Sequence, residues 1–185
     1  MRLGKTLYLT DRKQWRLWLA KNHQKEKEIW LVYPYKSSGK PRIQYNHAVE
    51  EVLCYGWIDS IVKKLDSERY CQRYSPRRPN SVLSQMNKER LRIMARAKKI
   101  TPFGLSAVSH AFDRNERFVI KKDILSAIKS NKEAWKNFQC LPERYKRVRI
   151  AYIEEYRDYD KGLFRRKLDY FIRMTSKNKK FGMLR

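Results

Sequence analysis

The chain has 185 residues and a strong basic excess, with 44 Lys and Arg against 19 Asp and Glu and a net charge of +25. Apolar residues make up 42% and aromatic residues 13%, enough for a folded core, which argues against a disordered chain. No apolar run approaches the roughly 20 residues of a membrane helix. No apolar segment follows the N-terminus, so we expect neither a membrane span nor a secretory signal.

Cysteines and histidines are too few and too scattered to form a recognisable site. The three cysteines and three histidines are Cys54, Cys71, Cys140, His23, His47 and His110. An odd number of distant cysteines predicts free thiols in a cytoplasmic protein, and the histidine spacing predicts no metal site. No cofactor fingerprint is present, so we expect no cofactor.

The first 112 residues mix helix and strand patterns. The predicted elements, in chain order, are a helix at 10–23 capped by Thr10, a strand at 28–36, a short helix capped by Asn46, strands at 57–65 and 69–74 joined by a turn at 66–68, a helix from Ser81 to about 99, and a helix from Thr101-Pro102 to about 112. This mixture indicates an α+β domain over residues 1–112.

The remaining residues have helical patterns only. The charged stretch at 113–122 is the predicted boundary, and three helices follow it: one from Asp123 with a break at Leu141-Pro142, one at about 142–157 and one from Asp160. We therefore expect an α+β fold, with a small antiparallel sheet of about three strands and helices in residues 1–112. A helical C-terminal part at 113–185 follows it.

An arginine pair marks the most informative segment. Residues 61–110 carry 12 basic and three acidic residues, and within them Tyr74-Ser75-Pro76-Arg77-Arg78-Pro79-Asn80-Ser81 precedes a predicted helix. Two guanidiniums, the capping hydroxyl of Ser81 and the hydroxyl of Ser84 at a helix N-terminus describe a site for a phosphate or a carboxylate. The alternative interpretation is that one arginine pairs with a carboxylate such as Asp59 while the other is solvated.

The second candidate is the turn that contains Trp57 and Asp59. Trp57 could form a wall for a flat ligand, and Asp59 could act as a base or orient a ligand. The alternative, that Trp57 packs in the core and Asp59 caps or pairs with an arginine, is somewhat favoured. In the strand at 69–74, tyrosines alternate with arginines, which predicts tyrosines inward and arginines outward and makes base stacking there the weaker hypothesis.

Two runs of sequence resemble a known family. Residues 45–59 (YNHAVEEVLCYGWID) and 74–87 (YSPRRPNSVLSQMN) resemble the bacteriocin-protection proteins, also called the YdeI or OmpD-associated family. The matching residues are Cys54, Gly56, Trp57, Asp59, Pro76, Arg77, Arg78, Ser81, Ser84 and Asn87. Leu83 stands where the family commonly has tryptophan, and Asn46 where an acidic residue is common. The resemblance implies a role in bacteriocin or stress protection without a defined chemistry.

Three functions remain open. The favoured hypothesis is a non-enzymatic protein that binds nucleic acid or a phosphorylated ligand, with Trp57, Asp59, Arg77, Arg78, Ser81, Ser84 and Asn87 as ligand-binding residues. A small-molecule pocket or enzyme centred on Trp57, Asp59, Arg77 and Arg78 is the first alternative, although no catalytic residue is assigned. A protein-interaction module is the second.

Overall fold

The structure is a computed structural model that describes residues 3–113 and 115–182. It divides into two compact units, Met1–Arg114 and Asn115–Arg185. This division lies two residues beyond the expected boundary at 112. Each unit has its own hydrophobic core, and each is described by itself.

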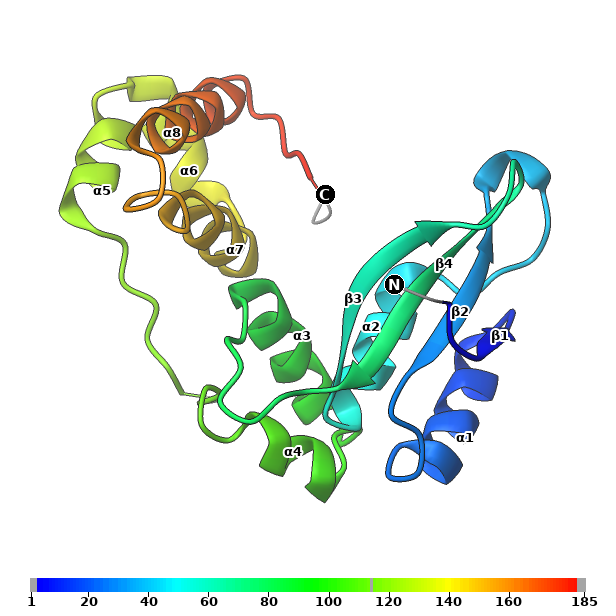
Figure 1. The fold of residues 1–185 in the computed structure, drawn as a ribbon. Coiled ribbons are helices and arrows are strands. Elements are labelled where there is room, and N and C mark those ends of the chain that lie inside the picture. Colours follow the sequence, from blue (N-terminus) through cyan, green and yellow to red (C-terminus); the bar gives the residue numbers. More distant parts are fainter. Residues whose placement is uncertain (1–2, 114, 183–185) are drawn as a thin grey trace. The chain divides into compact units, whose positions relative to one another are not determined.

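Unit 1 contains a four-stranded mixed sheet in the order β1-β2-β4-β3 (Figure 1). Its elements in chain order are β1 (Thr6–Tyr8), α1 (Arg12–Asn22), β2 (Ile29–Pro34), the 3₁₀ helix η1 (Lys36–Ser38), α2 (Tyr45–Cys54), β3 (Trp57–Lys64), β4 (Arg69–Pro76), α3 (Gln85–Arg96) and α4 (Pro102–Val108). The three predicted strands form the antiparallel part, which confirms the α+β fold. The short β1 adds a parallel edge strand that the prediction missed.

The core of unit 1 lies between one face of the sheet and helices α1, α2 and α3. Because side chains alternate across a strand, Leu31 and Tyr33 of β2 face this core together with Tyr74 of β4, and Trp15 and Val49 meet them from the helices. Figure 1 shows α1 and α2 on one side of the sheet. A polar side chain on this inner face of the sheet is removed from water and therefore needs a hydrogen-bond partner within the protein.

Helix caps in unit 1 differ from several predictions. Asp11, not Thr10, caps α1, because its carboxylate accepts bonds from the amides of Lys13 at 2.7 Å and Gln14 at 3.0 Å. Helix α2 begins at Tyr45, so Asn46 lies inside it. Ser84, not Ser81, caps α3. The prediction for α4 is confirmed, since Thr101 caps it with Pro102 in its first turn.

Unit 2 is helical, as the sequence predicts. It contains α5 (Lys122–Lys129), α6 (Lys132–Cys140), α7 (Glu143–Glu154) and α8 (Lys161–Ser176). Asp123 lies within the first turn of α5 and is not its cap. A cap at Asn131, whose side chain accepts from the amide of Ala134 at 2.9 Å, divides in two the helix predicted from Asp123 to the break at Leu141-Pro142. The helix predicted to start near Asp160 is α8, and Asp160 caps it by accepting from the amide of Leu163 at 2.8 Å.

In the described residues, no helix is both long enough and apolar enough to cross a membrane.

Candidate functional site

Asp59 occupies an irregular place in β3. It lies opposite Tyr74 on the inner face of the sheet, and a β-bulge separates it from Val62. The carboxylate is half-buried and accepts a hydrogen bond of 2.6 Å from the hydroxyl of Tyr45, in the first turn of α2. Bulges re-aim side chains and often adjoin functional sites. The fold therefore places the carboxylate of Asp59 beside a bulge in the sheet and close to the N-terminus of α2.

Tyrosine hydroxyls surround this carboxylate on the inner face of the sheet. Tyr33 and Tyr74 join their hydroxyls at 2.9 Å, and both lie close enough for the charge of Asp59 to influence them. Burial raises the pKa of Tyr33, Tyr45 and Tyr74, and the hydrogen bond to Asp59 raises that of Tyr45 further. These phenols therefore stay neutral and do not act as bases; Tyr45 donates to Asp59, and one of Tyr33 and Tyr74 donates to the other.

Arg77 follows β4 and begins the segment 77–84 that leads to α3, which we call the Arg77 loop; its side chain is buried. Its side chain is 8% exposed, and its Nη2 donates to the carbonyl of Val82 at 2.7 Å. Among the described residues, no acceptor reaches its Nε or its Nη1, and the buried hydroxyl of Ser81 also has no partner. Burial lowers the pKa of Arg77, and the negative charge of Asp59 opposes that change. We call Asp59, Tyr45, Tyr33, Tyr74 and Arg77 the Asp59 cluster.

A second polar network ties α2 to α3 beside this cluster. Arg90 of α3 donates to Asn87 at 2.8 Å and to Asn46 of α2 at 2.8 Å. Its positive charge also acts on the phenol of Tyr45. Amide oxygens from two helices that accept from one guanidinium, here the buried Asn87 and the exposed Asn46, hold the helices in one relative position. Asn87, which the sequence proposes as a ligand residue, is thus engaged with Arg90.

The seven predicted site residues separate in the structure. Asp59 and Arg77 come together, Asn87 lies in the adjoining network, and the side chain of Arg78 is exposed to solvent. Ser84 is occupied as the cap of α3, where it accepts from the amide of Asn87 at 3.3 Å. Ser81 lies on the Arg77 loop, and its carbonyl bonds to the ring of His110.

Trp57 lies in the core, away from any ligand surface. Its side chain is 0% exposed, its indole N–H donates to the carbonyl of His23 at 3.0 Å, and its ring meets Trp18 edge-on at 6.1 Å. A buried tryptophan whose N–H is satisfied contributes to packing. The structure therefore gives Trp57 the core position that the sequence offered as the alternative to a ligand wall.

The sequence interpretation missed the tyrosines and Arg90. Tyr45 and Tyr74 are the first residues of the two segments that resemble the known family. Their positions could have identified them, because a tyrosine at the start of a helix and a tyrosine in a strand can both reach a carboxylate. Tyr33 is hidden in an apolar strand, where it resembles any core aromatic residue. Arg90 is one of many basic residues, and only the packing of α3 on α2 distinguishes it.

The cysteines do not supply a nucleophile to this site. Burial raises the pKa of the Cys54 thiol to about 11, with a further contribution from Glu51, so the thiol stays protonated at neutral pH. The three thiols are free. Within residues 3–113 and 115–182, no three His, Cys, Asp or Glu side chains converge in a way that could hold a metal ion.

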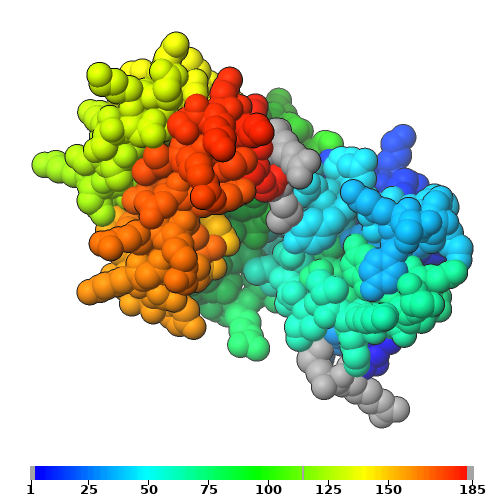
Figure 2. All heavy atoms as spheres, turned by 90° about the horizontal axis from the view of Figure 1, so that it is seen from above, coloured from blue at the N-terminus to red at the C-terminus, as the bar shows by residue number. Residues whose placement is uncertain are grey.

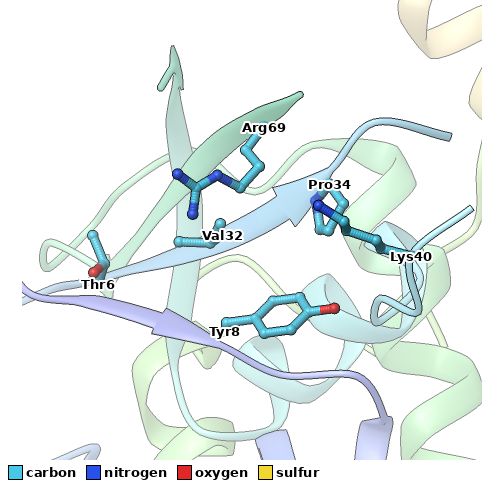
Figure 3. A pocket seen from close by; sticks show the side chains of 6 residues that line it. All are labelled: Thr6, Tyr8, Val32, Pro34, Lys40 and Arg69. Atoms are coloured by element: carbon cyan, nitrogen blue, oxygen red, sulfur yellow. The ribbon is translucent and has the colours of Figure 1, made fainter. Parts of the chain in front are cut away.

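The opposite face of the sheet carries the arginines of β4 and a shallow pocket. Tyr70 and Tyr74 pack towards the core, whereas Arg69 pairs with Asp66 at 2.7 Å and Arg73 with Glu28 at 2.7 Å, as the alternation predicts. Figure 3 shows the pocket, a depression of about 320 Å³. Its lining residues are Thr6, Tyr8, Val32, Pro34, Lys40 and Arg69. The tyrosines of β4 are thus turned away from solvent and do not form a stacking platform.

Unit 1 is an α+β domain whose inner sheet face carries a polar cluster of one carboxylate, three phenols and a buried guanidinium. The sequence profile of a family described as a domain of unknown function (DUF8412) matches residues 7–107, more than half of the chain. The chain belongs to this family. No curated protein and no solved structure matches it. The family description states no activity, and the resemblance to the bacteriocin-protection proteins stays a prediction.

Proposed function

We propose that this protein is a non-enzymatic binding protein whose ligand is a polyanion, most simply nucleic acid, in the cytoplasm. The observation that carries the proposal is the charge balance. If each of the 19 carboxylates paired with a different cation, 25 Lys and Arg side chains would still lack an acidic partner. Unneutralised cations attract phosphates and release condensed counterions when they bind.

The carboxylates of the protein are already engaged at several places, which supports this proposal. Glu51 lies between Arg12 and Arg16, and Glu154 pairs with Arg157 and Lys121. Some of the few acids therefore neutralise basic residues inside each unit. The chain has more basic side chains than acids to neutralise them, and this excess attracts an external anion.

Direct binding tests the proposal. A fluorescein-labelled 20-nucleotide DNA should gain anisotropy on addition of the protein at low salt, and unlabelled DNA should reverse the gain. Poly-glutamate of matched charge is the control, because it offers negative charge without phosphates or bases. Equal competition by poly-glutamate and DNA would show a general polyanion binder. No gain in anisotropy at low salt would contradict the proposal.

A second candidate function is favoured by Arg77. Its unpartnered Nε and Nη1 point to a small anion, such as a phosphate or carboxylate, that the Arg77 loop admits when it moves. Titration with inorganic phosphate should shift the Nε–Hε resonance of Arg77 in NMR spectra. Arg12 is the matched control, because its Nε already donates to Glu51. An unshifted Arg77 resonance at millimolar phosphate would contradict this candidate.

The resemblance to the bacteriocin-protection proteins supports a protective role. A protein-interaction module could fulfil that role as well as a polyanion-binding protein could. A protein partner that remains bound after nuclease treatment would favour that alternative. If the partner is lost together with the nucleic acid, the polyanion proposal is favoured.

A further inference from the structure

Unit 2 carries a surface on which aromatic and cationic side chains alternate. It combines residues of α7 and α8 with Tyr156, just past the end of α7, and Phe181, in the segment after α8. We call it the cation–aromatic ladder; in spatial order its members are Tyr156, Lys167, Tyr152, Arg149, Phe181 and Tyr170. None of these residues was a predicted site residue.

Helical spacing generates one side of the ladder. Arg149 and Tyr152 are three residues apart on α7, and Tyr156 follows four residues later, just past the end of the helix. Positions separated by three or four residues share one helix face. Lys167 and Tyr170 have the same spacing on α8, which packs against α7. Two helix faces thus present their aromatic and basic residues side by side.

Short contacts join each member of the ladder to the next. The Nζ of Lys167 lies 4.4 Å from the ring centroid of Tyr156 and 4.2 Å from that of Tyr152. The guanidinium of Arg149 lies 5.9 Å from the ring of Tyr152 and 5.1 Å from that of Phe181. The rings of Phe181 and Tyr170 are 4.9 Å apart, and Arg173 lies beyond, 5.3 Å from Tyr170. These are cation–π and edge-to-face distances.

The ladder is open to solvent at its tyrosines. Tyr152 and Tyr170 are each 40% exposed. Figure 2 shows atoms of α8 and of the following segment, in orange and red, on the face seen from above. Lys167 donates a 2.6 Å hydrogen bond to the hydroxyl of Tyr152 and thereby lowers its pKa. Tyr152 is therefore held in place while 40% of its surface remains accessible.

The basic excess around the ladder favours a negatively charged ligand. Residues 143–182 contain 13 Lys and Arg and six Asp and Glu. Three of these six acids are engaged locally, since Glu143 pairs with Lys146, Glu154 with Arg157, and Asp160 caps α8. Glu155 interacts electrostatically with Lys167. Among the described residues, no ion pair joins Arg149 or Lys167 to a carboxylate.

We propose that the cation–aromatic ladder binds single-stranded nucleic acid, with unstacked bases on the exposed tyrosines and phosphates beside Arg149, Lys167 and Arg173. Single strands fit because their bases are free to stack on aromatic rings, whereas a duplex offers only its backbone and groove edges. The inference rests on the proposed polyanion binding and gives it a location and a ligand class.

The test compares single-stranded and duplex 20-nucleotide DNA by fluorescence anisotropy on the full chain. Tyr152→Ala should weaken single-strand binding about tenfold, because base–aromatic stacking contributes about 1–3 kcal/mol per base. The same change should leave duplex binding and the salt slope unaltered. Tyr152→Phe, which keeps the ring, should remain within about twofold of the unmodified chain. Tyr156→Ala provides a second ring removal, and circular dichroism confirms that each variant is folded.

Tyr159→Ala is the matched control, because Tyr159 is 85% exposed and lies outside the ladder. If Tyr152→Ala binds the single strand as tightly as Tyr159→Ala, or if Tyr152→Phe loses as much as Tyr152→Ala, the ladder proposal is overturned. Polyanion binding would survive that outcome. If the unmodified chain binds neither DNA, both proposals fall together.

Discussion

Two buried charged residues of unit 1 have opposite surroundings. Glu51 is 1% exposed and lies between Arg12 and Arg16, with Arg16 at 2.6 Å. Arg77 is 8% exposed, and its side chain makes one hydrogen bond within the described part of the chain, to the carbonyl of Val82. A buried charge with good partners maintains the fold, whereas one with unused donors costs stability unless a ligand or a loop movement satisfies it. The first is therefore structural and the second is the candidate for function.

Glu51→Gln should lower the free energy of unfolding by about 3 kcal/mol, because it leaves Arg16 without its counter-charge and Arg12 with Glu50 alone. Urea unfolding followed by circular dichroism measures the change. Glu50→Gln is the control, since Glu50 pairs with Arg12 alone, at 2.8 Å, and should cost about 1 kcal/mol or less. Equal losses for the two variants would contradict a central role for Glu51.

Buried acids that ionise at high pH should make the protein labile to alkali. The pKa of Cys54 is raised to about 11, and burial also raises the pKa of Tyr33 and Tyr74. An acid whose pKa is higher in the folded state stabilises the fold below its unfolded pKa and loses that contribution as pH rises towards the folded value. Tm should therefore fall steadily between about pH 9 and 11. A constant Tm across that range would contradict the burial of these groups.

At the scale of elements, Ser81 and Ser84 contribute differently to stability, because only Ser84 caps the N-terminus of α3. Ser84→Ala should cost about 1 kcal/mol of unfolding free energy, because it removes the cap. Ser81→Ala should be neutral or slightly stabilising, because its buried hydroxyl makes no hydrogen bond to any residue that the structure describes. Paired urea titrations measure both. A larger loss for Ser81→Ala than for Ser84→Ala would show that the cap is misassigned.

Local signals in the sequence were sufficient for many elements. The turn at 66–68 between two strand patterns predicted the β3–β4 hairpin, and Thr101-Pro102 and Asp160 predicted helix starts. Strand β1 could not be predicted in this way, because it has three residues and forms by parallel pairing with β2, a distant segment. The split between α5 and α6 was missed, although Asn131 is a typical cap residue.

The candidate site was only partly predictable, because it too depends on contacts between distant segments of the chain. Asp59 and Arg77 were identified from their segments, and pairing of β3 with β4 brings those segments together. The partners of Asp59 depend on long-range packing, since the side chain of Tyr45 comes from a helix and Tyr33 from a different strand. The alternation of arginine and tyrosine in the ladder is visible in α7, but its completion by Lys167 requires the packing of α8.

At the scale of the molecule, the chain is two units joined near residue 114. Limited trypsin digestion should cut first at Arg117 or Lys121, because these exposed residues lie between α4 and α5, outside both helices. Mass spectrometry of the first fragments identifies the bond. First cleavage within α7 or α8, where basic residues are equally abundant, would contradict the division into two stable units.

The basic excess is distributed over both units, and polyanion binding is the central claim that depends on it. The most direct measurement is the salt dependence of binding to a 20-nucleotide single-stranded DNA. Each neutralised phosphate adds about −0.7 to the slope of log K against log salt concentration, so a site covering four to six phosphates predicts a slope of about −3 to −4. A slope near zero, or no binding at low salt, would contradict the account.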